Sequence, residues 1–253
     1  MTKQRSENAM EKLDFNAAFS FREFESWAQD EELTSRLRAC IEVQKQREPE
    51  LLKTRFQPNP HASEEVSAEQ LQSVLRTGKG VNRGLERNCF QFGFTDVESP
   101  IRDRKIRRLM HRVDRLVSAK VRDLFRSDQP IWADRTGHLW YPPGSYMCWH
   151  TNSGMPGWRM YMTYCDEPGK SFFRYRDPKS QEVVTSYDKK WTVRLFKVSA
   201  ENPLWHAVYS DTNRYSFGYR IVHRPALSGR ILDKLGRVWR DIQQGRLPRY
   251  REV

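Results

Sequence analysis

The spacing of apolar residues changes near residue 138, and this change separates a helical first part of the chain from a strand-rich second part. Before residue 138, apolar residues recur every three or four positions, as on one face of an amphipathic helix. After it, apolar and polar residues alternate in short runs bounded by Gly, Pro, Asn and Asp, as in half-buried strands. The pattern therefore predicts helices followed by a β-sheet core.

Capping residues and helix breakers predict three short helices in the first part. One starts at Ser20 with Phe21, Phe24 and Trp27 on its apolar side, one is capped by Asp30 and ends before Pro49, and one is capped by Ser67 and ended by Gly78. Residues 53–64 are predicted to form a loop and residues 89–94 a strand, and a last helix is predicted over 227–243.

The longest helical pattern runs over residues 100–126. Its apolar stripe comprises Ile106, Leu109, Met110, Val113, Leu116, Val117, Val121, Leu124 and Phe125. The opposite face carries Arg102, Arg104, Lys105, Arg107, Arg108, Arg112, Arg115, Lys120, Arg122 and Arg126. Two interpretations are open: a support helix with a solvated basic face, or a surface over residues 102–126 that binds nucleic acid or another anionic ligand.

Eight strands are predicted in the second part, and turn signals separate them. They cover residues 138–142, 146–151, 158–164, 171–175, 182–187, 191–198, 204–209 and 214–222. Short strands about ten residues apart are typical of an antiparallel sandwich or jelly roll. We expect an α+β fold in which an N-terminal helical region, residues 1–137, packs on a jelly-roll core with a C-terminal helix, residues 138–253. The two parts should form one integrated domain.

Charge adds a preference for anionic partners, since the formal net charge is +12 and the isoelectric point about 9.7. The cysteines lack the C-x-x-C spacing of a zinc site, and the polar N-terminus lacks a signal-peptide core. No apolar run approaches the roughly 20 residues that a membrane span needs. We expect a soluble, cytoplasmic protein without a membrane partner.

Two histidines and an arginine carry the candidate chemistry. Strand alternation puts Tyr146, Cys148, His150 and Asn152 on one face of their strand, and His206 shares a face with Leu204 and Val208. Arg214 and Ser216 also share a face, and together they offer a guanidinium fork and a hydroxyl to one carboxylate. Tyr146 and Arg159 are further candidates to line the same pocket.

The order of these residues resembles the Fe(II)- and 2-oxoglutarate-dependent dioxygenases. His150 lies on the second of eight predicted strands, His206 on the seventh, and Arg214 and Ser216 on the eighth. The resemblance implies a double-stranded β-helix, Fe(II) bound by the histidines, and 2-oxoglutarate bound by Arg214 and Ser216 beside Tyr146. It further implies hydroxylation of an unidentified substrate, with succinate and CO2 as coproducts.

Asn152 departs from the family pattern, in which a His-x-Asp or His-x-Glu motif supplies the third metal ligand. Its amide oxygen could ligate the metal, it could stand back and leave the position to water or halide, or the metal site could be inactive. The alternative function is therefore a non-catalytic jelly-roll protein that binds nucleic acid or a protein partner through a basic helical surface.

Overall fold

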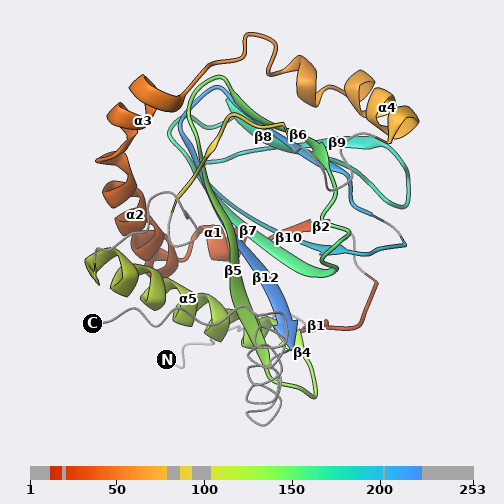
Figure 1. Cartoon of the computed structure of the whole chain (residues 1–253). Helices are drawn as coiled ribbons and strands as arrows, with labels where there is room; N and C mark the ends of the chain where they lie inside the picture. The colour runs from red at the N-terminus through yellow and green to blue at the C-terminus, as the bar shows by residue number, and fades with distance from the viewer. Residues whose placement is uncertain (1–11, 19–20, 79–85, 93–103, 202, 224–253) are drawn as a thin grey trace, which may run out of the picture.

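A computed structural model describes residues 12–18, 21–78, 86–92, 104–201 and 203–223, with side chains of the long helix described from Arg108 onward. The helix predicted over 227–243 lies outside these residues. Two antiparallel sheets form the centre of the described chain, and Figure 1 shows them as two layers with helices outside.

The larger sheet has six strands in the order β2-β10-β7-β12-β5-β3. They are β2 (Phe21–Glu23), β10 (Trp191–Val198), β7 (Gly157–Cys165), β12 (Arg214–His223), β5 (Ile131–Tyr141) and β3 (Phe90–Gln91). The smaller sheet has four strands in the order β6-β11-β8-β9. They are β6 (Ser145–His150), β11 (His206–Ser210), β8 (Ser171–Arg176) and β9 (Val183–Tyr187). A separate parallel pair joins β1 (Leu13–Asp14) to β4 (Phe125–Arg126).

Side chains from both sheets pack against one another between the layers. This inner cluster includes Tyr141 and Phe196 from the larger sheet and Met147, Phe173 and Val208 from the smaller sheet, all of them buried. Burial of large aromatic and aliphatic side chains is the main favourable contribution to such packing. The inner faces of the two sheets are therefore held together by an apolar layer.

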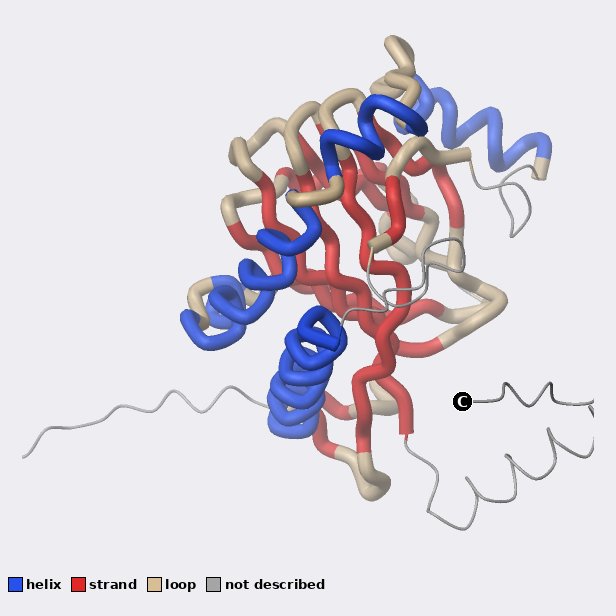
Figure 2. The backbone as a smooth tube through the Cα atoms, turned by 60° about the vertical axis from the view of Figure 1, so that its left-hand side comes forward, coloured by secondary structure: helices blue, strands red, loops and turns tan. Residues whose placement is uncertain are grey.

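The helices cover the outer faces of the sheets, as Figure 2 shows in blue around the red strands. They are α1 (Glu25–Ala28), α2 (Glu31–Lys45), α3 (Glu48–Arg55), α4 (Ala68–Thr77) and α5 (Arg104–Leu124), with a short 3-10 turn, η1 (Glu64–Val66). Leu37 of α2 and Val117 of α5 pack with Trp158 and Tyr215 behind the larger sheet. Leu71 of α4 packs with Trp149 behind the smaller sheet.

Most sequence-based elements are confirmed. Each of the eight predicted strands is present, from β5 to β12, although β5 begins at Ile131, seven residues before its predicted start. Asp30 and Ser67 accept hydrogen bonds from the backbone N–H groups of Leu33 and Gln70, at 2.8 and 3.0 Å. Gly78 ends α4 with a positive φ of 66°.

Two predictions near the N-terminus are wrong. Phe21–Glu23 forms β2 rather than the start of a helix, because it pairs with Arg194–Phe196 at the edge of the larger sheet. Phe21 also stacks on Tyr175 of the smaller sheet, with ring centroids 4.3 Å apart, so tertiary packing overrides the capping pattern. The sequence pattern takes Pro49 as a helix breaker, and α3 is therefore missing from the prediction. In the structure Pro49 lies in the first turn of α3, where proline is tolerated.

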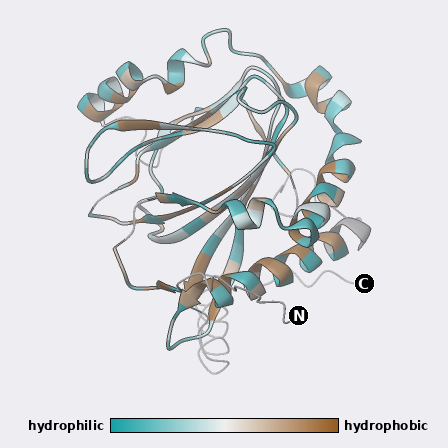
Figure 3. Ribbon diagram, turned by 180° about the vertical axis from the view of Figure 1, so that it is seen from behind, coloured by the Kyte–Doolittle hydropathy of each residue, from teal (hydrophilic) through white to brown (hydrophobic). Residues whose placement is uncertain are grey.

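The helix α5 has a buried apolar face and an exposed basic face. Met110, Val113, Val117, Val121 and Leu124 are buried against the larger sheet and α2. The exposed arginines described on or just after it are Arg108, Arg112, Arg115, Arg122 and Arg126. The hydropathy colouring of Figure 3 shows hydrophobic and hydrophilic residues alternating along this helix. The support role is thus present, and the basic face is open to solvent.

None of the helices in the described part of the chain is long and apolar enough to cross a membrane.

Two β-bulges shape the space between the sheets. On β6, the four residues from Met147 to His150 oppose three on β11, from Val208 to His206. On β5, the four residues from Arg135 to His138 oppose three on β12, from Tyr219 to Phe217. A bulge places one extra residue in one strand of a pair. In that strand, the alternation of inward- and outward-facing side chains is therefore reversed on one side of the bulge.

Gly218, opposite the β5 bulge, has no room for a side chain. A Cβ atom there would lie 2.7 Å from the Gly137 carbonyl oxygen and 2.9 Å from the Thr136 hydroxyl. We expect Gly218→Ala to lower the free energy of unfolding by about 1–3 kcal/mol, as other overpacked sites do. Gly137→Ala is the matched control, since its nearest contact is an ordinary 3.5 Å to the Leu139 side chain. Chemical denaturation compares the two, and equal stability of both variants would contradict the steric reason.

Candidate functional site

A cavity of about 180 Å³ lies between the two sheets. The larger sheet contributes β5, β7 and β12 to its lining, and the smaller sheet β6 and β11. Its lining residues are Arg87, Thr136, Gly137, Leu139, Tyr141, Met147, His150, Asn152, Met155, Arg159, Tyr161, His206, Val208, Arg214 and Ser216. The predicted residues His150, Asn152, Arg159, His206, Arg214 and Ser216 are all among them.

His150 and His206 are direct neighbours across the β6–β11 pair. They are cross-strand partners in the register, and their ring centroids lie 4.0 Å apart at an angle of 54°. Both are buried, and Phe173 and Phe196 pack against the His206 ring at centroid distances of 5.2 and 5.6 Å. The pairing predicted from the sequence is therefore present as two adjacent imidazoles on one wall of the cavity.

Backbone carbonyls fix the tautomer of both rings. The Nδ1 atom of His150 lies 2.9 Å from the Cys148 carbonyl oxygen, and that of His206 lies 2.9 Å from the Leu204 carbonyl oxygen. Since a carbonyl only accepts, each Nδ1 must carry the proton, and each neutral ring keeps its lone pair at Nε2. This arrangement is the one that orients metal-binding histidines in many proteins.

Burial keeps both rings neutral near pH 7. It lowers the pKa of His150 to about 4, although the hydrogen bond to the Cys148 carbonyl opposes the shift. The pKa of His206 is lowered well below its usual value by burial first and then by His150. Neutral imidazole is the form that binds a metal ion, so protons do not compete for these sites in the neutral range.

Asn152 lies beside the histidines. Its Nδ2 atom is 3.3 Å from His206 Nε2, and with the tautomer above the amide donates to that nitrogen. No group of three His, Cys, Asp or Glu side chains suited to a metal ion is found among the described residues. The donor set is thus two imidazoles and a neutral amide, which fits a divalent metal with one negative charge fewer than a set containing a carboxylate.

Arg214 lies at another wall of the cavity, and one arm of its guanidinium lacks a partner. Its Nε donates to Asp188 Oδ2 at 2.8 Å, and its NH2 donates to Thr163 Oγ1 at 3.3 Å. Its NH1 is buried and makes no hydrogen bond. A buried donor without an acceptor is costly, so this arm is suited to an anionic ligand in the cavity. Ser216, 5% exposed, lines the cavity two residues further along β12.

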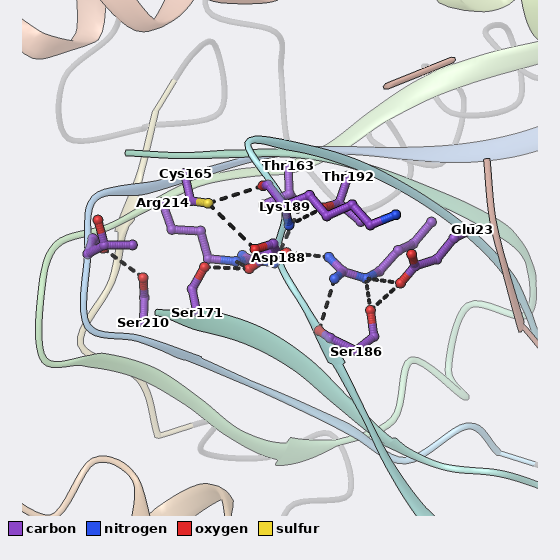
Figure 4. Close-up of polar contacts among 12 residues, drawn as sticks. Glu23, Thr163, Cys165, Ser171, Ser186, Asp188, Lys189, Thr192, Ser210 and Arg214 are labelled. Atoms are coloured by element: carbon purple, nitrogen blue, oxygen red, sulfur yellow. Dashed lines mark hydrogen bonds and ion pairs between the residues drawn. The ribbon is translucent and has the colours of Figure 1, made fainter. Parts of the chain in front are cut away.

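Asp188 holds Arg214 in place through a buried network, which Figure 4 shows. The carboxylate accepts hydrogen bonds from Arg194 NH1 at 2.5 Å, Arg214 Nε at 2.8 Å and Ser171 Oγ at 2.6 Å. Burial alone would raise the pKa of Asp188, but the charges of Arg214 and Arg194 and the Ser171 hydrogen bond outweigh it and lower that pKa to about 2. The guanidinium of Arg214 is therefore preorganised before any ligand binds.

Tyr146 is not brought to the cavity, contrary to the prediction. It packs with Trp149 against η1 and α4, on the outer side of β6. Simple alternation put Tyr146 on the face of His150, but the bulge between Met147 and His150 reverses the sense of the strand. Met147 lines the cavity in its place.

Several residues of the site were missed. Asp188 follows the strand predicted over 182–187, and the sequence carries no signal that its carboxylate contacts Arg214. Tyr161 lies two residues after the candidate Arg159 on β7, and that spacing could have identified it as facing the same side. Asp166 and Glu167, the acidic residues after β7, do not line the cavity; Asp166 accepts a hydrogen bond from Asn213 at 3.2 Å.

Comparisons with known proteins add little. No family model and no curated protein matches the chain. Among solved structures, it is similar to the crystal structure of AviO1 from Streptomyces viridochromogenes Tue57, with 15% identity and a TM-score of 0.39 over 86% of this chain and 98% of that one. A likeness at this level supports no functional conclusion.

Asp188 should control both stability and its pH dependence. Because its folded pKa lies below the usual 3.8, it stabilises the fold above about pH 4, and that contribution should be lost as the pH falls toward 2. We expect Asp188→Asn to cost about 3–5 kcal/mol, since two buried arginines lose their shared anion. Denaturant unfolding at pH 7 and pH 3 measures both effects. Wild-type-like stability of the variant would contradict the role of this network.

Proposed function

We propose that the protein is an Fe(II)- and 2-oxoglutarate-dependent oxygenase that hydroxylates a substrate and releases succinate and CO2. One observation carries this proposal: the cavity combines two adjacent imidazoles whose Nε2 atoms carry lone pairs with an arginine whose buried NH1 has no partner. A metal at His206 Nε2 would replace the hydrogen bond that this nitrogen accepts from Asn152. The imidazoles suit a divalent metal and the arginine suits a carboxylate, and 2-oxoglutarate is a dicarboxylate that needs both.

The strand pairing supports a double-stranded β-helix. The eight strands from β5 to β12 pair as first with eighth, second with seventh, third with sixth and fourth with fifth. This is the pairing of one long hairpin wound into two facing sheets, the arrangement of a jelly roll. His150, His206 and Arg214 then lie on the second, seventh and eighth strands, as the resemblance implies.

The side chains have distinct roles in this proposal. His150 and His206 hold the metal, with the Asn152 amide beside it, and Arg214 and Ser216 bind the distal carboxylate of 2-oxoglutarate. Bound together, Fe(II) and 2-oxoglutarate supply the oxidising chemistry. The protein orients them and keeps water out through the apolar packing around His206.

A second candidate function rests on the exposed arginines of α5. A non-catalytic protein could bind nucleic acid through Arg108, Arg112 and Arg115, since phosphate contacts supply most non-specific affinity. This candidate gives no role to the paired histidines or to the unpaired arm of Arg214. We therefore rank it second.

Iron binding should depend on the two cavity histidines. In anaerobic equilibrium titrations of Fe(II), His150→Ala and His206→Ala should each lower affinity by about a hundredfold or more, as loss of a metal ligand exceeds the 10- to 100-fold effect of an outer partner. His61→Ala is the control, because His61 is exposed and contacts Glu64. If the wild-type protein and both cavity variants bind iron equally, the metal site lies elsewhere. If none of them binds iron, the oxygenase proposal fails and the non-catalytic, nucleic-acid-binding function is favoured.

Binding of 2-oxoglutarate should depend on the fork of Arg214. Arg214→Lys keeps a positive charge beside Asp188 but loses the second arm, and affinity for 2-oxoglutarate should fall about tenfold to a hundredfold. Arg194→Lys is the matched control, since Arg194 contacts the same carboxylate from outside the cavity lining. Calorimetry on the metal-loaded protein measures both. Equal losses in the two variants would assign the effect to the network rather than to the cavity.

Asn152 should change the affinity for Fe(II) without being required for metal binding. Its amide lies within reach of His206 Nε2, so Asn152→Asp should tighten Fe(II) binding by adding a hard anionic ligand. Asn152→Ala should weaken it about tenfold. The same anaerobic titration reads both variants. An unchanged affinity in Asn152→Ala would show that this side chain stands back from the metal.

A further inference from the structure

The cavity contains a second buried arginine that the proposed function leaves unused. Arg159 lies on β7, is 2% exposed, and lines the cavity together with Tyr161. Residues 159, 161 and 163 share one face of the strand because side chains alternate. Thr163, the third of them, accepts the hydrogen bond from Arg214. One strand thus carries contacts to both ends of the cavity.

Arg159 lies near the start of β7, whereas Arg214, on β12, contacts Thr163 near its end. Arg159 pairs in register with Arg220, whereas Thr163 pairs with Ser216. These β7 positions are four residues apart, or about 13 Å at the rise of an extended strand. Tyr161 lies between them, and the histidines line the facing wall. A ligand anchored at Arg214 therefore leaves the Arg159 end for a second molecule.

Arg159 lacks the carboxylate partner that a buried guanidinium usually has. It donates to the carbonyl oxygens of Met155 and, at 3.3 Å, Trp158. Among the described residues, no Asp or Glu pairs with it, and its neighbour Arg220 is the one paired with Asp134, at 3.6 Å. Burial lowers the pKa of Arg159, a sign that the surroundings do not compensate its charge. Arg87 adds a further positive charge to the lining.

We propose that Arg159 binds the anionic group, a carboxylate or a phosphate, of a small organic substrate that occupies the end of the cavity opposite to Arg214. This inference rests on the proposed function, because it assigns Arg214 to 2-oxoglutarate. The substrate is small because the cavity measures about 180 Å³ and the guanidinium is almost fully enclosed. Its reacting carbon lies between this anchor and the histidines.

A purely structural role is the competing explanation. The two carbonyl contacts could serve only to hold the segment from Met155 to Trp158. Such a role predicts a loss of stability on substitution but no response of Arg159 to anions. Anion binding at this residue in the intact protein separates the two explanations.

The test uses the full-length, metal-free protein with inorganic phosphate and acetate as probes, in chloride-free buffer. NMR follows the Nε–H signals of the arginine side chains, and Arg159→Lys identifies the Arg159 signal by its absence. We expect a saturable shift of this signal with at least one probe, and the tighter probe indicates phosphate or carboxylate. The shift should persist in Arg214→Lys.

A charge-removing variant gives the matched comparison. Arg159→Gln keeps an amide that can donate to the Met155 carbonyl, and it should lower probe affinity at this site about tenfold or more. Should that variant fail to fold, the wild-type titration decides alone: no shift of the Arg159 signal with either probe overturns the proposal.

Binding of 2-oxoglutarate to the metal-loaded protein separates this inference from the proposed function. A shift of the Arg159 signal without any 2-oxoglutarate binding would reject the proposed function and leave the anion site standing. Loss of 2-oxoglutarate binding in Arg159→Gln, with retention in Arg214→Lys, would assign Arg159 to the cosubstrate and overturn the inference.

Discussion

The pairing of β6 with β11 is the constraint on which the site depends. It places His150 opposite His206, and the bulge beside them turns both rings toward the space between the sheets. The carbonyl groups of Cys148, in β6, and of Leu204, just before β11, then hold the Nδ1 protons, so that backbone geometry decides which nitrogen faces the cavity. A shift of one residue in this register would move one ring to the outer face. Metal binding in the proposed function is thus a consequence of strand register.

Charge burial is the second organising feature. Asp188 pairs with two arginines and preorganises Arg214, whereas Arg159 is buried with carbonyl partners only. Burying a cation without an anion is costly, and proteins retain such groups where a ligand supplies the missing charge. In the proposed account, the two arginines are therefore two anion-binding positions in one cavity, with the histidine pair on the facing wall.

Much of this arrangement could be predicted from the sequence, because alternation and turn residues are local signals. The eight strands, the helix caps at Asp30 and Ser67, and the positions of His150, His206 and Arg214 all follow from such signals. The failures are non-local. Tyr146 was misplaced because a bulge depends on the partner strand, and Phe21 was misplaced because pairing with β10 outweighed a capping pattern. Asp188 was missed because its importance arises only where three strands converge.

The most direct test of the account is an anaerobic optical titration of the Fe(II)-loaded protein with 2-oxoglutarate. Chelation of iron by 2-oxoglutarate produces a weak visible charge-transfer band, which requires metal and cosubstrate to occupy one site. The account predicts this band in the wild-type protein and its loss in His206→Ala. If the wild-type protein shows no band at saturating iron and 2-oxoglutarate, the cavity is not an oxygenase site.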